Sequence, residues 1–70
     1  MVFNQFAARL TELLSENKIS KRELAKRIGV SATSISDWST GRIQPTVENV
    51  YLICEYFQVS ADYMLGLKDI

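Results

Sequence analysis

Apolar residues recur at intervals of three and four along most of this 70-residue chain, which is the period of a helix with one buried face. The first such segment covers residues 3–16 and begins with Phe3 and Phe6. Shorter segments follow at residues 21–28, 32–39, 47–57 and 61–65. No segment alternates apolar and polar residues as a strand would. The pattern predicts an all-α fold of five helices in a single domain, 1–70, with 66–70 as a tail or the start of a linker.

The same spacing predicts which side chains form the core. In the first helix they are Phe3, Phe6, Ala7, Leu10, Leu13 and Leu14. In the second they are Leu24, Ala25 and Ile28, followed by Val30 in the turn. In the third they are Ile35 and Trp38, and in the fourth Val47, Val50, Ile53, Cys54 and Phe57. With 47% hydrophobic residues, the chain has the composition of a folded globule.

Residues suited to helix ends stand at the predicted boundaries. Hydroxyl side chains that can accept a hydrogen bond from the first turn precede four helices, at Ser20, Ser31, Thr46 and Ser60. Glycines that can adopt the left-handed conformation follow three of them, at Gly29, Gly41 and Gly66. We expect Asn17 to end the first helix in that conformation. We also expect Glu23 to complete a capping box by bonding the backbone N–H of Ser20.

Residues 20–38 carry the functional prediction. Two short helices joined by a turn that contains Gly29 make a helix-turn-helix, which places its second helix in the DNA major groove. Successive residues of a helix are rotated by about 100° around its axis. If Ile35 and Trp38 anchor that second helix in the core, its opposite side therefore carries four polar residues. These are Thr33, Ser36, Asp37 and Thr40.

Charge is balanced over the whole chain but unevenly distributed. Eight basic residues offset eight acidic ones. From Lys18 to Arg42, six basic residues stand against two acidic ones, a net charge of +4, and the rest of the chain carries −4. Such a distribution can present a positive face to phosphates, although a mixed surface without this role is the alternative.

Several functional classes are excluded or disfavoured. The chain has no histidine and one cysteine, so it lacks zinc-finger spacing, a His-based acid or base, and an internal disulfide. It has no signal-peptide pattern at its start and no apolar run near the ~20 residues of a membrane span. We therefore predict a cytoplasmic protein that is not an enzyme, does not bind a membrane, and has no metal, cofactor or small-molecule ligand.

Base contacts are predicted from Ala32, Thr33, Ser36 and Asp37. The Thr33 and Ser36 hydroxyls can donate or accept, the Thr33 methyl group or Ala32 can pack on a thymine methyl, and an ionised Asp37 can accept from cytosine N4. The alternatives are solvated hydroxyls and an Asp37 that holds Arg42 or repels phosphate.

Contacts to the DNA backbone are predicted on both sides of these residues. The start of the second helix offers N–H groups and Lys21 to a phosphate. The full set is Lys21, Arg22, Lys26, Thr40, Arg42 and Gln44. For Arg27, a solvated surface position is the preferred interpretation.

The chain resembles the lambda-repressor/Cro-type helix-turn-helix family, also called the xenobiotic-response-element regulators. The resemblance covers nearly the whole chain, through Ile19–Ser31, Ile35, Ser36, Trp38, Gly41, Pro45 and Tyr56–Gly66. It implies a five-helix DNA-binding domain that acts as a dimer on palindromic operators. It also implies backbone contacts near Lys21, Thr40 and Arg42, and base contacts from Ala32, Thr33, Ser36 and Asp37.

Two departures from the family pattern stand out. Many relatives pair an arginine in the first helix with a glutamate at the end of the third, where this chain has Leu14 and Ser39. Since both charges are absent together, no buried charge is left unpaired. Asp37 stands where relatives often have a basic or amide residue, so a base preference does not carry over.

Self-association is predicted through apolar residues near the end of the chain, with a weak homodimer as the expected state. The candidates are Tyr56, Tyr63, Met64, Leu67 and Ile70, the alternative being that Tyr63 and Met64 only close the core. Together these features predict a sequence-specific regulator of transcription, a repressor, that binds double-stranded DNA. The alternative is a helix-turn-helix module that binds another protein, such as a toxin or a regulator.

Overall fold

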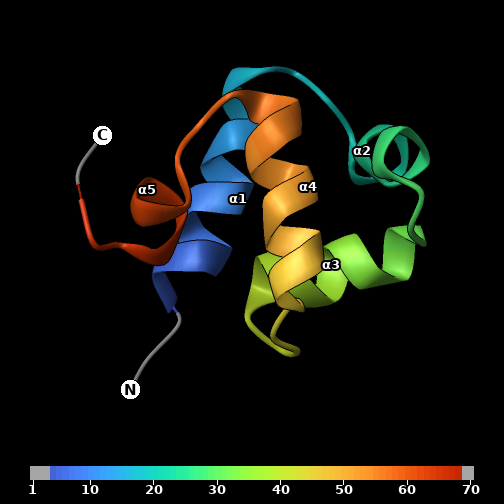
Figure 1. The fold of residues 1–70 in the computed structure, drawn as a ribbon. Helices are drawn as coiled ribbons and strands as arrows, with labels where there is room; N and C mark the ends of the chain where they lie inside the picture. The colour runs from blue at the N-terminus through green and yellow to red at the C-terminus, as the bar shows by residue number, and fades with distance from the viewer. Residues whose placement is uncertain (1–3, 69–70) are drawn as a thin grey trace.

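The computed structural model describes residues 4–68 and forms five α-helices (Figure 1). Their bounds are α1 Asn4–Glu16, α2 Lys21–Ile28, α3 Ala32–Thr40, α4 Val47–Phe57 and α5 Ala61–Leu65. The all-α prediction is confirmed, and the predicted bounds hold except that α3 runs one residue further. Phe3, the expected start of the first helix, lies outside the described residues. The molecule measures 28 × 22 × 21 Å between Cα positions.

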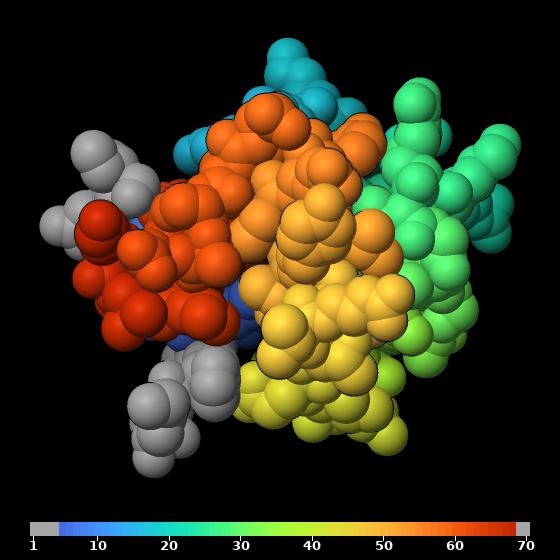
Figure 2. Space-filling model, in the orientation of Figure 1, coloured from blue at the N-terminus to red at the C-terminus, as the bar shows by residue number. Residues whose placement is uncertain are grey.

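The helices surround one core, with α1 packed against α3 and α5, and α2 packed against α3 and α4. In Figure 1, α4 crosses in front of α1, α5 lies on one side, and α2 and α3 lie on the other. The space-filling view shows that α4 (yellow to orange) and α5 (red) cover most of α1 (blue) from this direction (Figure 2). This arrangement leaves α2 and α3 at one end of the molecule, where other elements cover them on one side.

The predicted caps explain why the helices begin and end where they do. The side chains of Ser20, Ser31, Thr46 and Ser60 each accept a hydrogen bond from the N–H three residues later. Gly29, Gly41 and Gly66 each follow a helix in the left-handed conformation, at φ values near 80°. Since each cap satisfies an otherwise unpaired backbone group, the turns are defined locally.

Two details of the predicted helix ends are wrong. Lys18, and not Asn17, takes the left-handed conformation after α1, with a φ of 53°. Asn17 instead donates from its Nδ2 to the carbonyl of Leu13 at 2.8 Å, which satisfies a carbonyl of the last helical turn. Glu23 does not complete the capping box with Ser20, because its Oε2 accepts from Arg27 Nε at 3.0 Å.

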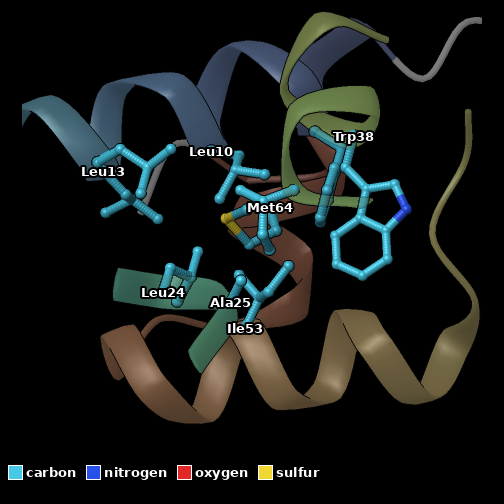
Figure 3. Packing of buried hydrophobic residues seen from close by; sticks show 10 residues of the cluster. Leu10, Leu13, Leu24, Ala25, Trp38, Ile53 and Met64 are labelled. Carbon is cyan, nitrogen blue, oxygen red and sulfur yellow. The ribbon is translucent and has the colours of Figure 1, made fainter. Parts of the chain in front are cut away.

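Side chains from all five helices meet in the core (Figure 3). Met64 of α5 lies near its centre in this view, with Leu10 of α1 on one side and Ile53 of α4 on the other. Six side chains are almost fully buried, namely Phe6, Leu10, Leu24, Ile35, Ile53 and Met64. Val30 also packs against the core from the turn, as predicted.

Two predicted core residues are not in the core, because Ala7 is half-buried outside the core cluster and Val47 is exposed. The Val47 side chain is 87% exposed, because it lies in the first turn of α4 while the helix reaches the core with Val50, Cys54 and Phe57. Cys54 is partly buried, and this burial raises the pKa of its thiol above the ordinary value. A thiol with a raised pKa is poorly reactive, which fits the interpretation of Cys54 as a small core residue.

The missing charge pair, the first departure from the family pattern, has a structural counterpart at Leu14 and Ser39. Leu14 is 7% exposed and belongs to the core. The Ser39 hydroxyl donates to the carbonyl of Ser36 at 3.0 Å, and the Ser39 carbonyl accepts from Thr11 Oγ1 at 3.1 Å. A neutral hydrogen bond therefore joins α1 to the end of α3 without a buried charge.

Candidate nucleic-acid interface

Helix α3 rests on two apolar anchors. Ile35 is completely buried and Trp38 is 5% exposed. On the side away from these anchors, Thr33 and Thr40 are exposed, and Ala32 is exposed in the first turn of the helix. The predicted direction of the helix is therefore confirmed. A helix with a buried side and a bare side of short residues can approach a surface closely.

Two of the predicted base-contacting residues are less accessible than the others. Ser36 and Asp37 are half-buried. The Asp37 side chain is 19% exposed and its Oδ1 lies 3.9 Å from Arg42 Nε, while the Arg42 side chain is 78% exposed. The Asp37 carbonyl also accepts from the backbone N–H of Arg42 at 2.9 Å. In this structure Asp37 thus holds the start of the loop after α3, as one of the sequence-based alternatives supposes.

A groove of about 480 Å³ brings together two of the predicted phosphate contacts. It lies between the end of α1, the start of α2 and the end of α3, and both Lys21 and Thr40 line it. Ser20, which caps α2, also lines the groove. The N-terminus of α2, with its backbone N–H groups and partial positive charge, therefore faces the same space as the Lys21 and Thr40 side chains.

The other predicted backbone contacts lie outside this groove. Arg22 and Lys26 are exposed on α2, and Arg42 and Gln44 are exposed in the loop after α3. Arg27 is paired with Glu23 on the surface of α2, at 60% and 44% side-chain exposure, as the solvated interpretation expected. The structure thus exposes positive side chains along α2 and in the loop beyond the end of α3.

Sequence reasoning missed a second exposed surface, formed by Ile43, Val47 and Tyr51, which we call the apolar stripe. These side chains are 51%, 87% and 60% exposed. They are spaced by four residues, so Val47 and Tyr51 share one face of α4, with Ile43 just before the helix. The four-residue spacing was visible in the sequence, but it is also the spacing of a buried face.

The predicted dimer residues differ in their accessibility. Met64 is completely buried and offers no surface to a second copy, so it closes the core, as the alternative supposed. Tyr63 is half-buried, with the Arg9 guanidinium 4.2 Å from its ring centre. Tyr56 is 39% exposed and packs edge-on against Phe57, and Leu67 is 72% exposed. Ile70 lies outside the described residues.

Two other features are absent from residues 4–68. No group of three or more Cys, Asp or Glu side chains among them is arranged to hold a metal ion. None of the described helices has the length and apolar character needed to cross a membrane.

Comparisons with known proteins agree with this geometry. The family model HTH_3, described as helix-turn-helix, matches residues 10–64. Among solved structures, a crystal structure of the P22 c2 repressor in complex with a synthetic operator superimposes with a TM-score of 0.84, at 30% sequence identity. The superposition covers 90% of this chain and 96% of that one.

Three curated proteins are similar in sequence. An uncharacterised transcriptional regulator, YobD of Bacillus subtilis, is 28% identical over 64 residues, and the activator BcrR of Enterococcus faecalis is 29% identical over 66. Repressor protein C2 of Salmonella phage P22 is 38% identical over 48 residues. The matches cover 91%, 94% and 69% of this chain but only 57%, 32% and 22% of those proteins.

Proposed function

Since the chain belongs to the Cro/C1-type helix-turn-helix family of DNA-binding transcriptional regulators, we propose a specific function for it. It is a sequence-specific repressor that places α3 in the major groove of DNA. The observation that carries the proposal is the polar face of α3 beside the groove that Lys21 and Thr40 line. The groove can hold a phosphate while the face reaches the bases.

Four residues of α3 are proposed to read the bases. Ala32 and Thr33 lie in the first turn, where a recognition helix directs its side chains at base edges. The Thr33 hydroxyl donates or accepts, and its methyl group packs on a thymine methyl. Ser36 and Asp37 lie one turn further and are half-buried, so they read only a base that approaches the helix closely.

Phosphate contacts are proposed to supply most of the affinity. Lys21 and Thr40 bind one phosphate at the groove, while Arg22 and Lys26 bind along α2. Arg42 and Gln44 bind the backbone beyond α3. Since each cationic contact releases counterions from the DNA, binding is expected to weaken steeply as salt rises.

We propose that two copies bind a palindromic operator and repress transcription. Two copies of α3 would then enter successive major grooves about 34 Å apart. Both an activator and a repressor occur among the similar proteins. Repression is favoured because occupying a promoter excludes polymerase without any further contact.

Selection of bound sequences from random duplex DNA tests this function. The expected result is an inverted repeat, bound by the protein in a gel shift with an affinity that falls as salt rises. Lys21→Glu is expected to abolish this binding while the protein stays folded by circular dichroism. If nothing tighter than non-specific binding appears at low salt, the proposal fails. If the protein instead binds a stoichiometric protein partner, and Lys21→Glu leaves that binding unchanged, the alternative of a helix-turn-helix module that binds another protein is favoured.

A further inference from the structure

We propose that Thr11 of α1 is a positioning residue for DNA recognition, which holds the end of α3 where the helix can distinguish its operator from other DNA. The proposal rests on the proposed function, since it concerns how α3 lies in the major groove. It assigns no contact with DNA to Thr11. The Thr11 hydroxyl acts through the carbonyl of Ser39, to which it donates a hydrogen bond at 3.1 Å.

The first argument is that this bond joins two distant parts of the chain. Thr11 and Ser39 are 28 residues apart. The other hydrogen bonds among residues 4–68 lie within one helix or at the turn next to it. The core also brings α1 and α3 together, but through apolar side chains, whose attraction has no preferred direction. A hydrogen bond weakens steeply when its angle changes, so this bond can fix the rotation and tilt of α3.

The second argument is the place of the bond. Both Thr11 and Ser39 line the groove that Lys21 and Thr40 also line. Ser39 directly precedes Thr40 in the chain. Because a peptide unit is planar, a bond that fixes the Ser39 carbonyl also fixes the Cα atom of Thr40. Thr11 therefore determines where Thr40 lies relative to Lys21 in the groove.

The two proposed phosphate contacts reach the groove in different ways. Lys21 follows α1 after a short turn, in which the backbone N–H of Ile19 donates to the carbonyl of Leu14 at 3.0 Å. The place of Lys21 relative to α1 is therefore set locally. Thr40 is the last residue of α3, so its place relative to α1 depends on the packing of the helices and on the bond from Thr11. Loss of that bond should displace Thr40 and leave Lys21 where it is.

The chemistry of the hydroxyl favours positioning over a direct contact with DNA. A threonine hydroxyl has one proton to donate, and a phosphate oxygen can only accept. Thr11 already donates that proton to Ser39. Since Thr11 is exposed, water can replace its hydrogen bond, and the bond adds little to the free energy of unfolding. Its removal is therefore expected to affect the position of α3 more than the stability of the fold.

A displaced α3 should mainly lower the specificity of DNA binding. Contacts with base edges require the helix at a defined depth and angle, whereas contacts with phosphates carry no sequence information. Non-specific binding rests on the phosphates. Loss of the bond should therefore weaken binding to the operator more than binding to other duplex DNA.

The test measures the dissociation constants of Thr11→Val for the selected operator and for a duplex of unrelated sequence, at one salt concentration. Valine keeps the shape of threonine and removes the donor. The operator affinity is expected to fall roughly fivefold, as for the loss of one hydrogen bond, with less than about a twofold change on the unrelated duplex. Thr11→Ser, which retains the hydroxyl, should keep most of the operator affinity.

Ser15→Ala is the matched control for Thr11→Val. Ser15 lies one helical turn further along α1 and lines the same groove. Its hydroxyl forms no hydrogen bond with another of the described residues, so it holds no part of α3. Ser15→Ala should therefore leave the ratio of the two affinities unchanged.

Three results would overturn the proposal. One is a Thr11→Val variant with unchanged operator affinity. Another is an equal loss on both duplexes, which is the result expected if Thr11 contacts a phosphate itself or only supports the folded state. The third is a loss that Thr11→Ser shares in full, because the hydroxyl would then have no role.

A second measurement separates this proposal from the proposed function. Hydrogen exchange of the backbone is recorded by NMR on the protein without DNA. The N–H groups of Arg42 and Ile43 both donate to the carbonyl of Asp37, at 2.9 and 3.3 Å, so they report on the end of α3. Thr11→Val is expected to speed their exchange roughly threefold, with exchange in α5 unchanged.

The exchange rates decide about Thr11 even without DNA binding. If the wild type binds no operator, the proposed function fails, and these rates alone test the positioning role. Faster exchange confined to the end of α3 would support it. Unchanged exchange at Arg42 and Ile43 in Thr11→Val would overturn it.

Discussion

Helices α3 and α4 are neighbours in the chain that expose opposite kinds of surface. Each is capped by a hydroxyl side chain and exposes one face. The exposed face of α3 carries Ala32, Thr33 and Thr40, while that of α4 carries Val47 and Tyr51. Short hydroxyl side chains suit a partner rich in hydrogen-bonding groups, whereas valine and tyrosine gain most from a contact that excludes water. The difference suits the two exposed faces to different kinds of contact.

The two helices also differ in how firmly they are held. Helix α3 has two buried anchors within nine residues, Ile35 and Trp38, and the bond from Thr11 to Ser39 near its end. Only Ile53 of α4 is fully buried, and Val47 at the start of α4 is exposed. A recognition helix needs a fixed position to discriminate between bases, whereas a contact between apolar side chains tolerates small shifts of the helix. The following predictions test this contrast.

The largest effect is expected from Trp38→Ala. Removing this buried side chain leaves a cavity under α3 and should lower the free energy of unfolding by about 3–5 kcal/mol. Urea unfolding followed by circular dichroism measures the change. Val47→Ala is the matched control on α4, and a comparable loss there would contradict the contrast.

The next effect is expected from Thr33→Ala on the exposed face of α3. Loss of the hydroxyl and methyl contacts should cost about 1–3 kcal/mol of discrimination at one base pair of the operator. Binding titrations against operators changed at single positions measure it. A uniform loss at every position would instead assign Thr33 to the DNA backbone.

A smaller effect is expected at the ends of the two helices. Gly41→Ala should destabilise the protein by about 1–2 kcal/mol, because alanine is strained at a φ of 80°. The added Cβ would lie 3.8 Å from Ala7 Cβ, an ordinary contact, so the cost comes from the backbone. Gln58→Ala is the control at the end of α4, where a side chain already occupies the left-handed conformation. Thermal unfolding should show a clearly lower Tm for Gly41→Ala alone.

The smallest effect is expected from Val47→Gln on the stability of the single chain. A side chain that is 87% exposed has little burial to lose, so the free energy of unfolding should stay within about 0.5 kcal/mol of wild type. Chemical unfolding at micromolar concentration, where the protein is expected to be monomeric, measures it. A larger loss would mean that Val47 supports the fold itself.

Most of the fold could be predicted because its boundaries are set locally. Ser20, Ser31 and Gly29 act within one turn of their own positions, so the sequence around them contains the information. The error at the end of α1 has the same origin. Asn17 can either turn left-handed or bond the preceding turn with its side chain, and only the structure shows that it bonds Leu13 and leaves the left-handed position to Lys18.

The exposed surface was harder to predict, because exposure depends on what the other helices cover. The bare side of α3 followed from Ile35 and Trp38, since two anchors define its opposite face. Val47 fits the period of a buried face, yet its side chain is 87% exposed. The same limit applies to Thr11, whose bond to Ser39 spans 28 residues of sequence and leaves no local pattern.

Thr40 shows how an internal bond can govern an external one. Its hydroxyl donates to the carbonyl of Ser36 at 3.0 Å, and a phosphate oxygen can only accept. To bind a phosphate as proposed, the Thr40 hydroxyl must rotate away from the Ser36 carbonyl. That carbonyl still accepts a hydrogen bond from the Ser39 hydroxyl. One donor bond is thus exchanged for another, so only the difference between the two bonds adds to the affinity. Thr40 would then fix where the duplex lies along the protein and contribute little to how tightly it is held.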